Sequence, residues 1–317
     1  MTRAFMFPGQ GSQAVGMGKA LADASPAARA VFEEVDTALD EKLSAIMWEG
    51  PEDTITLTAN AQPALMAVSL AVMAMLKEDH SVDPLAKIAF VAGHSLGEYS
   101  ALAAAGALSV GDAARLLRAR GAAMQSAVPV GEGAMAAMLG ISLEDAEKLA
   151  QEASSDGVCQ VANDNAPGQV VLSGAKAGVD KAVVIAKDFG AKRAIPLKVS
   201  APFHCELMQP AADVMKSALA DVDISAPQVP LIANVLAAPI SDPEQIRTRL
   251  VEQVTGTVRW RECMTAMAGA GVDTFHEIGA GKVLCGLARQ IDRSLTSSDT
   301  GSPEAIEELA TALKQAA

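Results

Sequence analysis

The residues best suited to chemistry stand in Gly93-His94-Ser95-Leu96-Gly97, a Gly-x-Ser-x-Gly motif centred on Ser95. An apolar run, 88–92, precedes the motif and predicts a short buried strand, and the alanine-rich run 100–107 after it predicts a helix. A serine on such a sharp turn exposes its hydroxyl, and backbone N–H groups at the helix start can stabilise a developing oxyanion. The motif predicts a nucleophilic serine; the alternative is an ordinary turn capped by serine.

A serine hydroxyl is a weak nucleophile, so Ser95 needs a general base, and histidine is the best candidate near neutral pH. The chain has four histidines: His80, His94, His204 and His276. We expect His80 to be solvated, the side chain of His94 to point away from that of Ser95, and His276 to be a strand residue. His204 stands in a loop, where catalytic side chains are often carried, and position alone makes it the leading candidate.

Composition limits the classes of protein to which the chain can belong. Half of the 317 residues are hydrophobic, so the chain can bury a large core as one α/β domain or as a large and a small unit. A net charge of −13 and an aromatic content of 3% disfavour binding to nucleic acid. Four widely spaced cysteines suggest neither a disulfide framework nor a metal site.

The apolar segments suggest no membrane attachment. The N-terminal segment turns at Pro8 before it reaches the length of a signal peptide, so we expect a cytoplasmic protein. The longest apolar run, 63–76, is shorter than a membrane span and predicts a buried helix.

The elements around the motif predict an α/β fold made of two units. Residues 3–7 predict a strand, and 27–40, 62–77 and 110–128 predict helices. Farther along, 274–278 predicts a strand and 281–291 a helix, 294–302 predicts a mobile linker, and 303–316 predicts a final helix.

The middle of the chain has a different pattern. Strands are predicted at 134–139, 158–162, 169–172 and 192–197, and helices at 142–153 and 176–189. The order is βαββαβ, which is typical of a ferredoxin-like unit. We therefore predict a ferredoxin-like small subdomain, 130–198, inserted in a large α/β-hydrolase-like subdomain, 1–129 and 199–317, that carries the nucleophile elbow.

Six separated motifs resemble one family. They are Phe7-Pro-Gly-Gln-Gly-Ser-Gln13, Gly93-His-Ser-Leu-Gly-Glu98, Arg120-Gly121, Asn165-Ala-Pro-Gly-Gln169, Pro202-Phe-His204 and Gly279-Ala-Gly-Lys-Val283. Their order is that of malonyl-CoA:acyl carrier protein transacylases, and the resemblance runs from about residue 3 to about residue 313.

The resemblance implies a ping-pong transfer of a malonyl group from malonyl-CoA to the phosphopantetheine thiol of acyl carrier protein. Ser95 would be the nucleophile and His204 the base, with no bound cofactor and no metal. The backbone N–H groups of Gln10 and Leu96 would form the oxyanion hole. A backbone carbonyl near Arg259 would orient the imidazole of His204.

The resemblance also implies how malonyl is chosen. Arg120 would hold the malonyl carboxylate, because a planar guanidinium can bind a carboxylate through two hydrogen bonds. Phe203 resembles the residue of malonyl-selective members, and Met124, one helical turn after Arg120, would line the pocket.

Both substrates are acidic, as is the chain, so the interpretation requires a basic rim near Ser95. The candidates are Lys192, Arg193, Lys198, Arg259, Arg261, Lys282 and Arg289.

Two alternatives share some of these features. A serine thioesterase or other hydrolase would have the same elbow but would also want a His-Gly-Gly type of oxyanion loop, which the sequence lacks. A non-catalytic docking module for carrier proteins would not need Ser95, His204, Gln10 and Arg120 together. We expect a monomer that serves fatty-acid synthesis.

Overall fold

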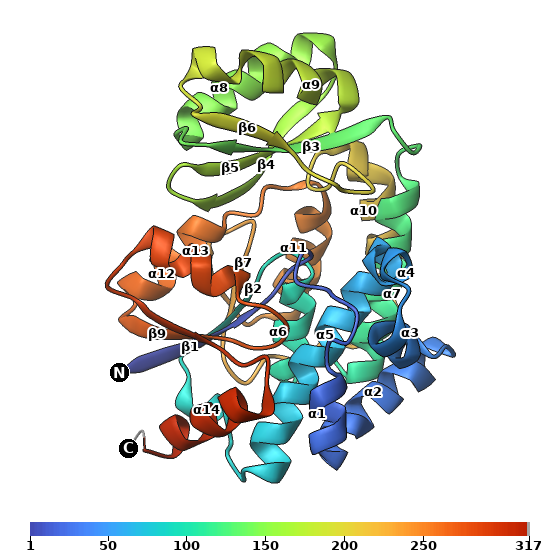
Figure 1. Cartoon of the computed structure of the whole chain (residues 1–317), viewed down its shortest axis with the longest axis vertical. Coiled ribbons are helices and arrows are strands. Elements are labelled where there is room, and N and C mark those ends of the chain that lie inside the picture. The colour runs from blue at the N-terminus through green and yellow to red at the C-terminus, as the bar shows by residue number, and fades with distance from the viewer. Residues whose placement is uncertain (316–317) are drawn as a thin grey trace.

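The computed structural model describes residues 1–315, which fold into a larger mixed α/β unit and a smaller unit stacked on it (Figure 1). The α/β class predicted from the sequence is confirmed. The larger unit is built on a six-stranded sheet with the order β10 (Thr296–Asp299), β9 (Val272–Glu277), β1 (Thr2–Phe7), β2 (Phe90–Gly93), β7 (Leu231–Ala233) and β8 (Ala238–Ile240). Neighbouring strands are parallel except β7 and β8, which are antiparallel.

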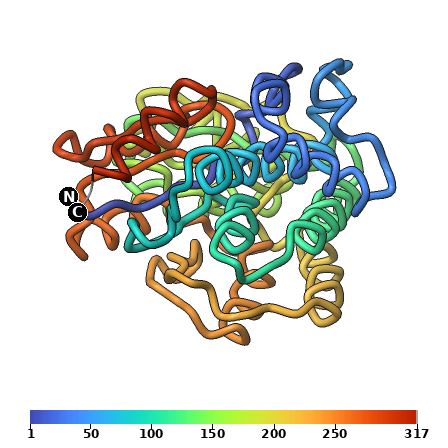
Figure 2. Tube along the Cα trace, turned by 90° about the horizontal axis from the view of Figure 1, so that it is seen from below, coloured from blue at the N-terminus to red at the C-terminus, as the bar shows by residue number. Residues whose placement is uncertain are grey.

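Helices surround this sheet. They are α1 (Lys19–Ala24), α2 (Pro26–Leu39), α3 (Leu43–Glu49), α4 (Glu52–Thr56), α5 (Thr58–Ala74), α6 (Gly97–Ala104), α7 (Val110–Ser126), α10 (Gln209–Ala220), α11 (Pro243–Thr255), α12 (Trp260–Gly269), α13 (Val283–Ile291) and α14 (Pro303–Gln315). Viewed from below, the first helices (blue) and the C-terminal segments (red) occupy different sides of this unit (Figure 2).

The α5 helix is apolar on all sides because it is enclosed by the protein. Together with the turn that follows, it gives a helical stretch, Thr58–Asp79, that is long and apolar enough to cross a membrane, but 89% of its apolar window is buried inside the protein. Its side chains pack with those of α2 and α7 in the main hydrophobic core. The sequence prediction of a buried helix is confirmed, although the helix begins four residues earlier than predicted, at Thr58.

The smaller unit has the predicted order of elements. These are β3 (Gly133–Leu139), α8 (Leu143–Ala153), β4 (Cys159–Ala166), β5 (Gln169–Ala175), α9 (Lys176–Ile185) and β6 (Arg193–Pro196). The strands form an antiparallel sheet with the order β4-β5-β3-β6. The two helices cover the outer face of this sheet, and its other face lies toward the larger unit (Figure 1).

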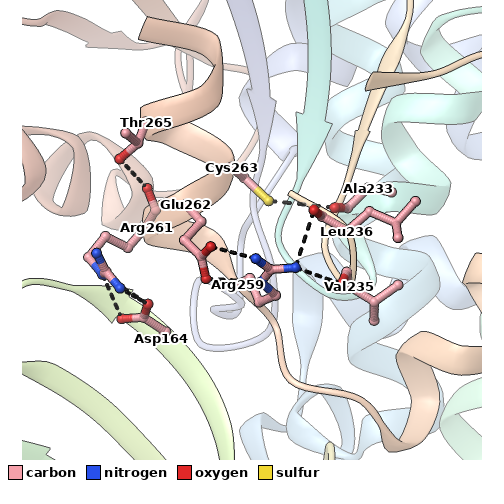
Figure 3. Close-up of polar contacts among 9 residues, drawn as sticks. All are labelled: Asp164, Ala233, Val235, Leu236, Arg259, Arg261, Glu262, Cys263 and Thr265. Carbon is pink, nitrogen blue, oxygen red and sulfur yellow. Dashed lines mark hydrogen bonds and ion pairs between the residues drawn. The ribbon is translucent and has the colours of Figure 1, made fainter. Parts of the chain in front are cut away.

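One edge of the small sheet is joined to the larger unit by hydrogen bonds. The backbone of Val258 donates to Ala162 O over 2.9 Å and accepts from Asp164 N over 3.0 Å, so a segment of the larger unit extends the edge of β4. Arg261 forms an ion pair of 2.7 Å with the buried carboxylate of Asp164, across the same junction (Figure 3). This junction fixes β4 against the larger unit.

The prediction of a mobile linker at 294–302 is wrong. This stretch contains β10, which pairs with β9 in parallel. Its polar side chains make specific bonds: the Ser298 hydroxyl contacts His276 Nδ1 at 2.8 Å, and the Thr300 hydroxyl donates to Glu277 O over 2.8 Å. Serine and threonine suggested a solvated linker, but at the edge of a sheet they can bond to the neighbouring strand.

Candidate active site

Ser95 lies on the sharp turn that the motif predicts, between the end of β2 at Gly93 and the start of α6 at Gly97. Its φ angle of 54° is left-handed, a strained conformation for a residue with a side chain. The flanking glycines are required by close packing: a Cβ atom on Gly93 would lie 1.8 Å from the carbonyl carbon of Gly97, and one on Gly97 would lie 2.3 Å from Phe7 O. The turn is therefore a nucleophile elbow in its geometry.

His204 is the histidine that the structure brings to Ser95. Its Nε2 atom lies 2.8 Å from Ser95 Oγ, and its Nδ1 atom lies 2.9 Å from Gln253 O. A backbone carbonyl can only accept, so Nδ1 carries the proton and the lone pair of Nε2 faces the serine hydroxyl. His204 also has a left-handed φ angle, 60°, so both members of the pair sit on strained backbone.

The carbonyl that orients His204 belongs to Gln253, six positions before Arg259, near which the sequence placed it. Gln253 lies in the last turn of α11, where carbonyl groups have no partner within the helix and are free to accept. The backbone N–H of Arg259 instead donates to Asn234 O, and its guanidinium bonds to Glu262 and to the carbonyl groups of Val235 and Leu236 (Figure 3).

Burial keeps the imidazole of His204 neutral. Only 4% of His204 is exposed, and this burial, with the nearby charge of Arg120 as the next cause, lowers its pKa from 6.5 to about 3. A neutral imidazole with its lone pair on Ser95 Oγ can accept the hydroxyl proton at any pH above that value.

Arg120, on α7, is a buried cation beside Ser95. It is 1% exposed and donates through Nη1 to Gln62 Oε1 (2.9 Å) and through Nη2 to Gln253 Oε1 (2.8 Å) and Ser95 Oγ (3.1 Å). Its guanidinium carbon lies 5.8 Å from the centre of the Tyr99 ring. No Asp or Glu within residues 1–315 forms an ion pair with it. A buried cation with neutral partners is suited to bind an anionic group of a substrate.

Gln10 and Leu96 are the residues that the sequence predicts to form an oxyanion hole. Gln10 lies in the turn after β1 and Leu96 in the elbow, and both residues line the same cavity as Ser95. Across the described part of the chain, neither backbone N–H has a hydrogen-bond acceptor. The side chain of Gln10 is held by a hydrogen bond of 3.3 Å to Thr58 Oγ1.

All of the predicted site residues line one cavity of about 450 Å³. These are Ser95, His204, Gln10, Leu96, Arg120, Phe203 and Met124. The smaller unit contributes the other wall, through Met135, Ala137, Asn163, Asn165, Gln169 and Val171. The active residues therefore come from the larger unit, and the smaller unit closes the cavity over them.

Two of the other histidines, His94 and His276, make contacts away from Ser95. The Nε2 atom of His94 lies 2.8 Å from Asn165 Oδ1 of the smaller unit. His276 is a strand residue of β9. The four cysteines are free and buried.

Of the seven expected rim residues, two are committed to ion pairs away from the cavity. Arg259 pairs with Glu262, and Arg261 pairs with Asp164 (Figure 3). The other five, Lys192, Arg193, Lys198, Lys282 and Arg289, are exposed and form no ion pair with any residue from 1 to 315. Lys198 lines the cavity, and Lys282 precedes Val283, which also lines it.

Four polar residues of the site were missed from the sequence: Gln62, Glu98, Asn234 and Gln253. Gln62 gave a weak signal, as a polar residue within an apolar helix, and Glu98 belonged to a recognised motif without an assigned role. Asn234 and Gln253 gave none, because they lie far along the chain from the elbow that they contact.

Comparison with known proteins gives a consistent result. A model of the acyl transferase domain family matches residues 4–312. The chain is 48% identical over 313 residues to the malonyl CoA-acyl carrier protein transacylase of Bacillus subtilis strain 168, covering 98% of this chain and 97% of that protein.

Solved structures agree. The acyl-carrier-protein-S-malonyltransferase of Bartonella henselae superposes with a TM-score of 0.96 at 57% identity, over 99% of this chain and 100% of that one. A malonyl-transacylase in complex with its type II PKS acyl-carrier protein has a TM-score of 0.93 at 38% identity, over 99% of each chain.

Proposed function

Because this chain belongs to the acyl transferase family of malonyl-CoA–acyl carrier protein transacylases, we propose that Ser95 carries the malonyl group between two thiols. The enzyme transfers malonyl from malonyl-CoA to acyl carrier protein. The reaction we propose has two half-reactions with one covalent intermediate, and we propose that it serves fatty-acid synthesis.

In the first half-reaction, Ser95 Oγ attacks the thioester carbonyl while His204 Nε2 accepts the hydroxyl proton. The carbon–sulfur bond then breaks, and His204 returns the proton to the departing sulfur of CoA. In the second, the thiol of acyl carrier protein gives its proton to His204 and attacks the malonyl-serine, and Ser95 Oγ leaves with that proton. The distance of 2.8 Å between Ser95 and His204 supports this role.

The charge that develops on the carbonyl oxygen needs donors that are free before substrate arrives. We propose that the backbone N–H groups of Gln10 and Leu96 form this oxyanion hole, and their lack of acceptors within residues 1–315 supports the assignment. Phe203 and Met124 would narrow the cavity around the acyl group; both are nearly fully buried and line it.

The position of Arg120 is the observation that supports selectivity for malonyl. Its charge is buried, faces no carboxylate of the described chain and lies 3.1 Å from the nucleophile. The carboxylate that distinguishes malonyl from acetyl would supply the missing anion. A hydrolase acting on neutral acyl groups would have no use for a buried cation at this place.

Incubation with malonyl-CoA labelled in the malonyl group tests the proposal against its alternatives. We expect label on the protein without acyl carrier protein, and label on acyl carrier protein once it is added. Free malonate as the main product would instead indicate a thioesterase or other hydrolase. No label on either protein would indicate a non-catalytic docking module.

We further propose that the smaller unit is a ferredoxin-like subdomain, 130–198, inserted in an α/β-hydrolase-like subdomain, 1–129 and 199–317. The βαββαβ order and the strand order β4-β5-β3-β6 support the first part, and the elbow supports the second. We propose that the enzyme works as a cytoplasmic monomer, without a bound cofactor and without contact with a membrane.

The low pKa of His204 predicts the pH dependence of the first half-reaction. Because the pKa is lowered from 6.5 to about 3, the neutral base is lost only as the pH falls toward 3. We expect the rate of malonyl-enzyme formation, measured in single turnovers by quenched mass spectrometry, to stay constant between about pH 5 and pH 7. A loss of rate with a midpoint near pH 6.5 would show that His204 titrates as an ordinary histidine.

The unpaired cations near the cavity predict a charge effect on the second substrate. We expect Lys198→Glu and Lys282→Glu each to raise the KM for acyl carrier protein by roughly 3- to 10-fold, and less so at high salt. Lys77→Glu is the matched control, because Lys77 is exposed and pairs with Glu78 outside the cavity. Equal effects of all three changes would contradict a local basic rim.

A further inference from the structure

Glu98 is a buried carboxylate directly behind the active site. It lies in the first turn of α6 and is 1% exposed. It forms no ion pair within residues 1–315; its oxygens accept hydrogen bonds of 2.5 Å from Asn234 N and from Gln253 Nε2. A buried charge is costly unless hydrogen bonds and an opposite charge compensate it, so this position calls for a function.

Both partners of Glu98 hold parts of the site. Asn234 bonds to the backbone of the elbow at two points. Its Oδ1 accepts from Ser95 N over 2.8 Å, and its Nδ2 donates to Gly93 O over 2.7 Å. Gln253 accepts from His204 through its carbonyl group and from Arg120 through Oε1. Glu98 is therefore one residue removed from the nucleophile, the base and the buried cation.

The Glu98 carboxylate, together with Ser95 O, sets which way the Gln253 amide faces. A primary amide has one accepting end and one donating end. Its donating end meets two acceptors, Glu98 Oε2 and Ser95 O, which leaves Oε1 for the guanidinium of Arg120. A neutral amide at position 98 could donate a hydrogen bond to Gln253. If the Gln253 amide rotated to accept it, its NH₂ group would face the N–H groups of Arg120, and the hydrogen bond to Arg120 would be lost.

Glu98 and Arg120 also interact electrostatically. Burial raises the pKa of Glu98 to about 8, against the hydrogen bonds and the Arg120 charge that lower it. Burial lowers the pKa of Arg120, while Tyr99 and Glu98 act in the opposite direction. Burial raises the pKa of Tyr99 far above neutrality, so its phenol is uncharged. The charge of Arg120 favours the ionised form of Glu98, against the effect of burial.

We propose that Glu98 is a positioning residue for malonyl selectivity: through the Gln253 amide it holds the Arg120 guanidinium beside Ser95, oriented for the substrate carboxylate. The inference rests on the proposed role of Arg120. Acyl groups without a carboxylate depend on Arg120 only through its contact with Ser95 Oγ, so they should depend much less on Glu98.

The test compares Glu98→Gln with the parent enzyme on malonyl-CoA and acetyl-CoA. We expect kcat/KM for malonyl to fall by roughly 10- to 100-fold, the range found when a group that orients a binding residue is removed, and mostly through KM. We expect acetyl transfer to change by less than about 3-fold. Glu98→Asp, which keeps the carboxylate, should recover most of the malonyl preference.

Glu262→Gln is the matched control, because Glu262 pairs with Arg259 outside the cavity, and it should leave the malonyl-to-acetyl ratio unchanged. Equal losses on both acyl groups in Glu98→Gln, or no loss, would overturn the inference. If Glu98→Gln does not fold, Gln253→Ala breaks the same link and keeps the backbone carbonyl; an unchanged ratio there would also overturn it. If Arg120→Ala leaves the malonyl-to-acetyl ratio unchanged, the proposed role of Arg120 is wrong. If Arg120→Ala lowers this ratio and Glu98→Gln does not, only the inference about Glu98 is wrong.

Discussion

Replacing Ser95 by alanine is expected to lower malonyl transfer by on the order of 10⁵-fold and to abolish the malonyl-enzyme. Ser95 Oγ is the atom that His204 faces at 2.8 Å and that Arg120 contacts at 3.1 Å, so no other hydroxyl in this cavity has both partners. Transfer to acyl carrier protein and covalent labelling by malonyl-CoA, followed by intact mass spectrometry, measure the two effects.

Ser100→Ala is the matched control for this change. Ser100 is buried in α6, the helix that follows Ser95, and it does not line the cavity. Its hydroxyl has no hydrogen-bond partner within residues 1–315. We expect transfer in Ser100→Ala to stay close to that of the parent enzyme. Labelled protein in Ser95→Ala, with an unfolding curve like that of the parent, would mean that another residue carries the malonyl group.

The elbow was predictable because it is local. Gly93, Ser95 and Gly97 lie within five positions, between a short apolar run and a helical run, and the packing of one glycine against the other needs nothing from the rest of the chain. The order of elements in the smaller unit was predictable for a similar reason, since each strand and helix has its own pattern of apolar residues.

The polar network behind Ser95 was not predictable from local pattern. Glu98 and Gln253 are 155 positions apart, and Ser95 and Asn234 are 139 apart, so only the fold brings them together. The orienting carbonyl of Gln253 is a backbone atom, which leaves no trace in residue types. The strand β10 was missed because serine and threonine are common in linkers, and its register depends on β9, a neighbour in space.

This network explains why a cation can rest beside a nucleophile without a counter-ion in contact. The Nη1 and Nη2 atoms of Arg120 donate to amide and hydroxyl oxygens from Gln62, Gln253 and Ser95, which do not neutralise its charge. Its Nε atom has no hydrogen-bond partner within residues 1–315. A carboxylate in direct contact would compete with the substrate for the same guanidinium. The Gln253 side chain lies between Glu98 and Arg120, so Glu98 leaves the guanidinium free for the substrate.

Replacing Arg120 by alanine is therefore expected to change selectivity more than catalysis. Loss of a buried, charge-assisted contact to the malonyl carboxylate should lower kcat/KM for malonyl-CoA by roughly 100- to 1,000-fold, equivalent to about 3–4 kcal/mol. Acetyl-CoA has no carboxylate, and its transfer should fall by less than about 10-fold, a loss that reflects the missing contact with Ser95 Oγ. Steady-state kinetics on the two substrates give the ratio.

Arg115→Ala is the control from the same helix, because Arg115 is exposed and pairs with Asp112. It should leave both rates unchanged, since removal of an exposed ion pair costs little. If Arg120→Ala lowered malonyl and acetyl transfer equally, Arg120 would act on Ser95 or on folding instead of on the substrate carboxylate. The preference for malonyl would then have to arise from the shape of the cavity, where Phe203 and Met124 are the residues to change next.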